Sequence, residues 1–109
     1  MRREIVLAPE AEEDLRALKA NRRAAVRHGM ETHLRHEPTK TSRSRIKRLR
    51  GTSRPQYRLR IEDVRIFYDV THEAVEVLAI VPKAQAVAWL KRHAEPRKAA
   101  VRKNEGTTS

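Results

Sequence analysis

The chain has 109 residues, enough for one domain with a modest core. Its 25 lysines and arginines against 14 acidic residues give a net charge of +11, which favours nucleic acid or an acidic partner protein. The absence of cysteine excludes disulfides and thiol chemistry, and no apolar run approaches the ~18 residues of a membrane-spanning helix. No leader-like apolar segment follows the first residues, so we expect a soluble cytoplasmic protein without membrane attachment.

Two helices are predicted in the N-terminal part of the chain, after a short apolar strand over residues 3–7. The first helix begins at Pro9, a residue typical of a first helical turn, and acidic residues follow it. Asn21 is expected to break or cap the chain before a second helix over residues 22–36, which Pro38 ends. Their apolar residues recur at helical spacing and predict a hairpin packed on a sheet: Ala11, Leu15 and Leu18, then Val26, Met30 and Leu34.

The segment between Pro38 and Pro55 is the most basic part of the chain. Ile46 and Leu49 stand three residues apart and predict one turn of helix anchored to the core, which Gly51 ends. The cations around them suit a surface that follows a phosphate backbone, and a solubilising linker is the alternative. The candidate RNA- or phosphate-binding residues of this segment are Lys47, Arg48 and Arg50.

A stretch of alternating apolar and polar residues follows, and it predicts three consecutive antiparallel strands over residues 57–61, 64–70 and 75–81. If Glu62-Asp63 is a two-residue turn, three apolar pairs face each other on the core side of the sheet. Glu-Asp is poor chemistry for such a turn, so a longer loop with a different register remains open. The expected pairs are Ile61 with Val64, Leu59 with Ile66, and Tyr57 with Tyr68.

The same register places Arg60 opposite Arg65 on the other side of the sheet, with Arg58 next along. Like charges directly across a ladder destabilise a sheet, so this cluster indicates a site for an anion, and phosphate is the obvious candidate. The alternative is a solvated face on which the arginines splay apart. RNA cleavage by 2′-hydroxyl attack would also need a proton acceptor, and Lys83 could serve if its neutral form were favoured.

After the third strand, Pro82 precedes a helix over residues 83–92 with Ala86, Trp89 and Leu90 on one side. Trp89 could stack on a base, but we expect it to pack this helix onto the sheet. No metal site and no cofactor is expected, because the histidines lack ligand spacing and no glycine-rich phosphate loop occurs.

These elements predict an α+β domain over residues 3–92 and a basic, disordered tail over residues 93–109. The sheet is expected to be small and mainly antiparallel, made of the N-terminal strand and the three-stranded meander. The helical hairpin should cover one face of it, and the C-terminal helix should be short.

The order of these elements resembles the RelE/ParE superfamily of toxins from type II toxin–antitoxin systems. The likeness covers residues 3 to 92 and rests on the motifs Leu34-x3-Pro38, IKRLRG from Ile46, YRLR from Tyr57, VRIFY from Val64, and the apolar run before Pro82-Lys83. By this resemblance Arg58 and Arg60 match basic strand residues that RelE-like toxins use on mRNA in the ribosomal A site. Arg65 matches their phosphate-stabilising arginine, and Lys83 matches a basic residue at the end of the last strand, which makes Arg65 and Lys83 the candidate catalytic residues.

The chain departs from RelE-like nucleases at three positions. Ala84 stands where they carry a further arginine, and Trp89 and Leu90 stand where they carry a tyrosine or histidine. ParE-like members share the fold and poison DNA gyrase without that catalytic set. The resemblance therefore implies a toxin that cleaves mRNA on the ribosome, with a gyrase inhibitor or a non-catalytic basic nucleic-acid-binding module as alternatives. A toxin would be held by a cognate antitoxin through an acidic or amphipathic segment.

Overall fold

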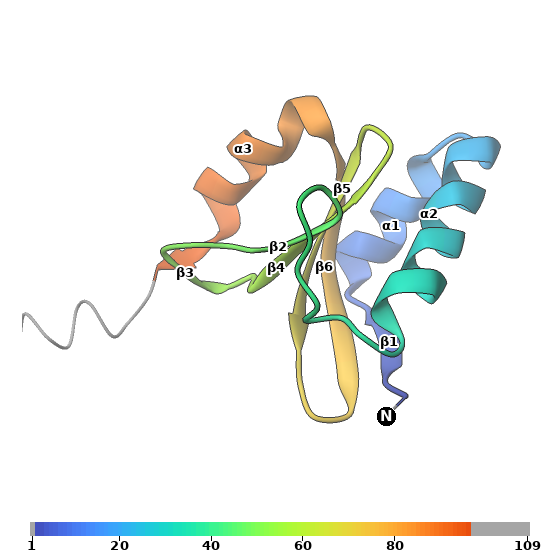
Figure 1. Ribbon diagram of the computed structural model, residues 1–109. Helices are drawn as coiled ribbons and strands as arrows, with labels where there is room; N and C mark the ends of the chain where they lie inside the picture. The colour runs from blue at the N-terminus through green and yellow to red at the C-terminus, as the bar shows by residue number, and fades with distance from the viewer. Residues whose placement is uncertain (1, 97–109) are drawn as a thin grey trace, which may run out of the picture.

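A computed structural model of the chain describes residues 2–96. Five strands form one sheet in the order β1-β6-β5-β4-β2, in which β1 runs parallel to β6 and the other pairs are antiparallel. Helices α1 and α2 cover one face of this sheet and α3 lies on the other (Figure 1). The predicted α+β class is confirmed. The elements are β1 (Glu4–Leu7), α1 (Pro9–Ala17), α2 (Ala20–Leu34), β2 (Ile46–Arg48), β3 (Thr52–Arg54), β4 (Tyr57–Ile61), β5 (Val64–Val70), β6 (Ala74–Pro82), α3 (Lys83–His93) and β7 (Glu95–Pro96).

The predicted register of the β4–β5 hairpin is confirmed, with Glu62-Asp63 as its turn. Glu62 adopts a φ of 54°, the left-handed region that costs a non-glycine residue about 1–2 kcal/mol. Two other elements hold the turn in place. Arg22 of α2 forms ion pairs with both Glu62 and Asp63, and the Lys83 N–H donates to the Asp63 carbonyl at 2.7 Å. These contacts explain how a turn with unfavourable residues keeps the two-residue register.

The main core lies between the helical hairpin and the sheet, and the three predicted apolar stripes meet there as expected. Leu59, Ile66 and Tyr68 of the sheet are fully buried against it. Gly29 lets α2 approach β4 closely, because a Cβ built there would lie 2.2 Å from Ile61 Cδ1. The close approach accounts for a glycine in a helix where alanine would be favoured by roughly 1 kcal/mol.

A second, smaller core lies on the opposite face, under α3. It contains Phe67, Ala79 and Val81 of the sheet, against which Ala86, Trp89 and Leu90 of the helix pack. The ring of Trp89 stacks on that of Phe67 with centroids 5.0 Å apart. The expectation that Trp89 fastens the C-terminal helix to the sheet is therefore confirmed.

The predicted bounds of the hairpin were wrong at the break between its helices. The first helix ends at Ala17, and the extended residues Leu18 and Lys19 make the connection. Asn21 lies inside α2, where its Oδ1 accepts a hydrogen bond from the Arg22 N–H, so it neither breaks the chain nor caps the helix. The second helix stops at Leu34, two residues before the predicted end.

The helical turn predicted around Ile46 and Leu49 was also wrong, because these residues belong to the edge strand β2 and its exit. Neighbouring side chains of a strand point to opposite faces, so a spacing of three places the pair on different sides. Ile46 accordingly enters the main core and Leu49 packs on the core under α3. Gly51 follows with a φ of 77°, in the turn between β2 and β3.

The predicted start of the disordered tail differs from the structure. His93 lies in α3, and Glu95–Pro96 form β7, which pairs with β3. The Ser53 hydroxyl adds a hydrogen bond to the Pro96 carbonyl at 3.1 Å. The rest of the predicted tail, residues 97–109, lies outside the described residues. None of the helices in the described part has the length and apolar character that crossing a bilayer requires.

Candidate phosphate-binding face

Three arginines gather on the side of the sheet opposite the helical hairpin, and we call Arg58, Arg60 and Arg65 the arginine face. Arg60 is the direct cross-strand partner of Arg65, as predicted. Arg58 stands opposite Phe67 on β5 and opposite Lys47 on β2. Alternation along β4 and β5 therefore places all three side chains on one face, with Lys47 beside them on the edge strand.

Arg65 is the most enclosed of the three, with 7% of its surface exposed. Its Nη1 donates to the carbonyls of Glu62 at 3.0 Å and Val64 at 3.2 Å. Burial, and then the charge of Arg60, lowers the pKa of the Arg65 guanidinium, while Asp63 acts in the opposite direction. The turn therefore fixes the direction of this side chain, and its charge is only partly balanced.

Arg58 carries a buried polar atom without a partner. Among the described residues, its Nε is the one buried side-chain nitrogen or oxygen that makes no hydrogen bond. Burial lowers the pKa of the Arg58 guanidinium, and Arg65 and Arg60 lower it further. A buried donor that is left unsatisfied costs free energy. A ligand that supplied an acceptor to Arg58 Nε would therefore bind favourably.

No arginine of this face forms a salt bridge with a carboxylate within residues 2–96, although the charge of Asp63 acts on Arg65. Asp63 forms its ion pair with Arg22, and the Asp69 carboxylate lies 3.5 Å from the Arg54 guanidinium. Burial raises the pKa of Asp69, although the Gln56 N–H and Arg54 act against that change. A cluster of arginines that forms no salt bridge is the kind of surface that binds phosphate groups.

Lys83 begins α3 directly after the last strand, as predicted. Its backbone N–H is bonded to the same two-residue turn whose Glu62 carbonyl holds Arg65. The side chain of Lys83 is exposed to solvent. The two candidate catalytic residues are thus tied to a single turn, one through its guanidinium and the other through its main chain.

The predicted cations of the basic segment divide between the two faces of the sheet. Lys47 joins the arginine face across β4. Arg48 does not, because its guanidinium lies over the Tyr57 ring, 5.1 Å from the centroid, and Tyr57 packs on the hairpin side. Arg50 lies beyond the strand and lines a surface hollow with Lys47 and Arg48.

Arg45 was not among the predicted site residues, yet it is bonded to the arginine face. Its carbonyl accepts a hydrogen bond from the Arg60 N–H at 2.9 Å, and its Nη1 donates to the Arg60 carbonyl at 3.3 Å. Arg45 precedes β2, and its hydrogen bonds to the Arg60 main chain join distant parts of the chain, so no local pattern marked it. Within the described part, no group of three or more histidine, cysteine, aspartate or glutamate side chains is placed to hold a metal ion.

Comparison with known protein families shows which family this chain matches. The family described as the ParE toxin of type II toxin–antitoxin systems, parDE, matches residues 5–87, which include the five-stranded sheet except Glu4, and the arginine face. The chain belongs to this toxin family. The predicted membership of the RelE/ParE superfamily is thereby confirmed. Comparison with curated protein sequences yields no match.

Solved structures share the fold of this ParE-family chain at low sequence identity. One is a chain of the archaeal RelE–RelB complex from Pyrococcus horikoshii OT3, with a TM-score of 0.63, 20% identity, and coverage of 78% of this chain and 99% of that chain. A second is from the RelB–RelE antitoxin–toxin complex of Methanococcus jannaschii, with a TM-score of 0.58, 16% identity, and coverage of 77% and 96%. A third is from the E. coli DinJ–YafQ toxin–antitoxin complex, with a TM-score of 0.56, 15% identity, and the same two coverages.

Proposed function

We propose that this ParE-family toxin stops translation by cutting mRNA on the ribosome, in the cytoplasm. The observation that carries the proposal is the crowding of Arg58, Arg60 and Arg65 without a carboxylate partner among the described residues. Burial and mutual repulsion disfavour the charged forms of Arg58 and Arg65, and the opposite charge of a bound phosphate would offset both effects. A phosphate group of the mRNA would therefore stabilise this surface.

In this proposal Arg65 stabilises the charge that develops on the scissile phosphate, because the Glu62 and Val64 carbonyls already fix its direction. Arg58, Arg60 and Lys47 bind the neighbouring phosphates. The attacking 2′-oxygen bonds to phosphorus as the bond to the 5′-oxygen breaks, so one proton leaves the 2′-hydroxyl and one reaches the leaving oxygen. Lys83 is the residue that we assign to this proton transfer.

Inhibition of DNA gyrase is the second candidate, and two observations favour it. The matching family model is that of the ParE toxin. The α3 positions where RelE-like nucleases carry tyrosine or histidine hold Trp89, which is stacked on Phe67, and Leu90, which packs beside it. A toxin without a catalytic acid or base can still act by binding its target. A general basic nucleic-acid-binding module is the less favoured alternative, because the chain belongs to a toxin family.

The cognate antitoxin is the partner that we propose for the free toxin. A net charge of +11 suits an acidic or amphipathic segment that orders as it wraps the helical hairpin and the sheet. Such a segment would neutralise the arginine face while the toxin is held inactive. A toxin that kept full activity in the purified complex would contradict this arrangement.

The deciding experiment is induced expression with parallel measurement of protein synthesis and plasmid supercoiling, followed by mRNA cleavage on purified ribosomes. We expect synthesis to stop before supercoiling changes, and Arg65→Gln to reduce cleavage by roughly tenfold or more, since a charged hydrogen bond is worth about 1.5–3 kcal/mol. Arg43→Gln removes an equal charge from an exposed position outside this face and serves as control. An early change in supercoiling with synthesis intact would favour gyrase.

Lys83→Ala separates the two roles open to that residue. If Lys83 transfers a proton, the variant should lose more cleavage than RNA binding, and if Lys83 only holds phosphate, both should fall equally. The exposed position of its side chain makes a folding defect unexpected. Thermal melting confirms that each variant is folded before activities are compared.

A further inference from the structure

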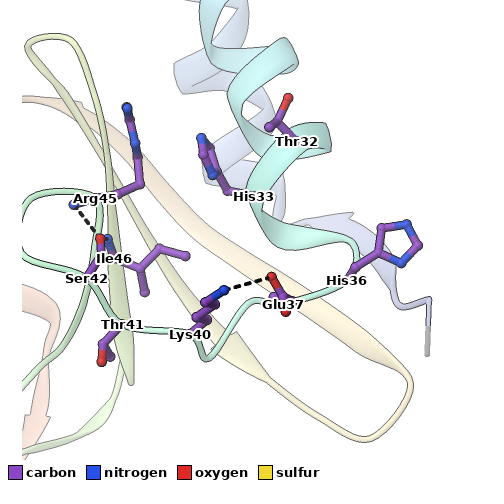
Figure 2. A pocket seen from close by; sticks show the side chains of 9 residues that line it. All are labelled: Thr32, His33, His36, Glu37, Lys40, Thr41, Ser42, Arg45 and Ile46. Carbon is purple, nitrogen blue, oxygen red and sulfur yellow. Dashed lines mark hydrogen bonds and ion pairs between the residues drawn. The ribbon is translucent and has the colours of Figure 1, made fainter.

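A cleft of about 290 Å³ lies between the end of α2 and the loop that leads into β2, on the hairpin side of the sheet (Figure 2). We call it the His33 cleft, after the half-buried imidazole on its α2 wall. The loop opposite is held firmly. The Tyr68 hydroxyl donates to the Pro38 carbonyl at 2.7 Å, and the Ser42 N–H donates to the Ile46 carbonyl at 3.0 Å. The walls of the cleft are therefore built into the fold.

The polar groups around the cleft are mostly hydrogen-bond donors. The Ser42 hydroxyl accepts the N–H groups of Arg45 at 3.0 Å and Ile46 at 3.4 Å, so its own proton remains to be donated. Arg45 uses one nitrogen on the Arg60 carbonyl and pairs with no carboxylate in the described part of the chain. The ring of His33 makes no hydrogen bond within the described residues either. A ligand that fits this set must supply acceptors.

The charge of the cleft leads to the same conclusion. Its one carboxylate, Glu37, is 3.7 Å from the ammonium group of Lys40 and is neutralised by it (Figure 2). Burial lowers the pKa of His33, and the charges of Arg45 and His28 lower it further. The His33 imidazole, from α2, and the Arg45 guanidinium, from the loop into β2, both line the cleft (Figure 2). An anion between them would offset their repulsion.

The cleft continues into the cationic surface of the sheet. Arg45 is bonded through its main chain to Arg60 of the arginine face. A neighbouring hollow shares Thr41, Ser42 and Ile46 with the cleft and extends to Lys47, Arg48 and Arg50. One polyanionic strand can therefore contact the arginine face and pass over the edge of β2 into the cleft.

We infer that the His33 cleft binds a backbone phosphate of the RNA strand, next to the phosphates held by the arginine face, with Arg45, His33 and Ser42 as its contacts. The choice of RNA as the source of that phosphate rests on the proposed function. Recognition of the phosphate group itself rests only on the donors and charges of the cleft. A phosphate site here would extend the contact between the toxin and the mRNA beyond the cleavage position.

The test uses the full-length protein and a short single-stranded RNA whose 2′-O-methyl groups prevent cleavage. Binding is followed by fluorescence anisotropy and by the NMR signals of the His33 ring. We expect the RNA to shift these signals, and Arg45→Gln, His33→Gln and Ser42→Ala each to weaken binding about three- to tenfold, the low end for charged contacts because the cleft is open to solvent. Arg43→Gln, an equal change in the same loop outside the cleft, should bind as the parent does.

Inorganic phosphate and an acidic peptide are tested beside the RNA to identify the source of the anion. The inference is supported if phosphate shifts the His33 signals only at much higher concentration than the RNA. It is overturned if the RNA causes no shift, whether free phosphate or the acidic peptide occupies the cleft instead or nothing does. Folding is verified by the unchanged signals of His72 and His93, which do not line the cleft.

The two proposals fail in different ways. If the toxin leaves mRNA intact on ribosomes yet RNA still shifts the His33 ring signals, RNA binding in the cleft is supported and the proposed function is contradicted. If Arg65→Gln abolishes cleavage while Arg45→Gln changes neither RNA binding nor cleavage, the proposed function is supported and RNA binding in the cleft is contradicted.

Discussion

Arg60 and Arg65 stand directly opposite each other in the β4–β5 ladder, and neither pairs with a carboxylate within residues 2–96. Like charges at such positions destabilise a sheet by roughly 0.2–1 kcal/mol. We therefore expect Arg60→Gln to raise the free energy of unfolding by up to about 1 kcal/mol, and more at low ionic strength, where screening is weak. Urea denaturation at two salt concentrations measures both effects, and toxicity should fall as stability rises.

Arg48 on the neighbouring strand β2 supplies a control for the sign of this stability change. Arg48→Gln loses a cation–π contact with Tyr57 on the other face, so its stability should hold or fall by about 0.5 kcal/mol. A loss of stability in Arg60→Gln equal to that in Arg48→Gln would show that the arginine face carries no repulsion to relieve.

Gly29 should resist replacement although it lies in a helix. Gly29→Ala gains about 1 kcal/mol of helix propensity, but its new Cβ meets Ile61 Cδ1 and Cγ1, and overpacking costs roughly 1–3 kcal/mol. We expect a net loss of stability, measured by thermal or chemical denaturation. Adding Ile61→Val removes the nearer of the two atoms and should recover part of the loss, which a purely local defect of the helix would not allow.

The Tyr68 hydroxyl fastens the loop after α2 to the central strand. Because Tyr68→Phe leaves the Pro38 carbonyl buried without its donor, we expect the free energy of unfolding to fall by about 1–2 kcal/mol. The loop that lines the His33 cleft should also exchange its amide hydrogens faster. Tyr57→Phe is the matched control, since Tyr57 stacks on Tyr68 and its hydroxyl has no partner among the described residues.

His33 should make stability depend on pH. Its pKa in the folded chain lies below the ordinary 6.5, so the unfolded chain binds the proton more tightly. The stabilising contribution is therefore present above pH 6.5 and is lost as the pH falls through 6.5 toward the folded-state pKa. Between pH 7.5 and 5.5 the parent should lose more stability than His33→Gln, as measured by urea denaturation. Equal losses in the two proteins would show that burial and Arg45 do not act on this ring.

The meander and its arginine face could be predicted because both follow from alternation along two adjacent strands. Tyr57 to Tyr68 contains enough apolar residues at period two to fix the register, and the opposite parity then fixes Arg58, Arg60 and Arg65. The edge strand β2 could not be predicted in this way. It has three residues, one of them buried, so its pattern is too short to distinguish strand from helix.

The remaining features depend on contacts between distant parts of the chain. Lys19 caps α2 without a side-chain hydrogen bond, so the helix start has no sequence signature. The His33 cleft exists because the loop after α2 folds back and is held by Tyr68, 30 residues further along. Local patterns carry no information on such contacts, and this is why Arg45 and His33 were not recognised as neighbours.

The parallel pairing of β1 with β6 has a consequence for the order in which the toxin is made. Glu4 lies beside Ala74 and Leu7 beside Val77, so β1 cannot pair until β6 has been synthesised. Contacts of such long range form late in folding. A nascent chain cut short before β6 lacks an inner strand of the sheet, so we expect truncated translation products to be inactive. A complete sheet is therefore available only after β6 has been synthesised.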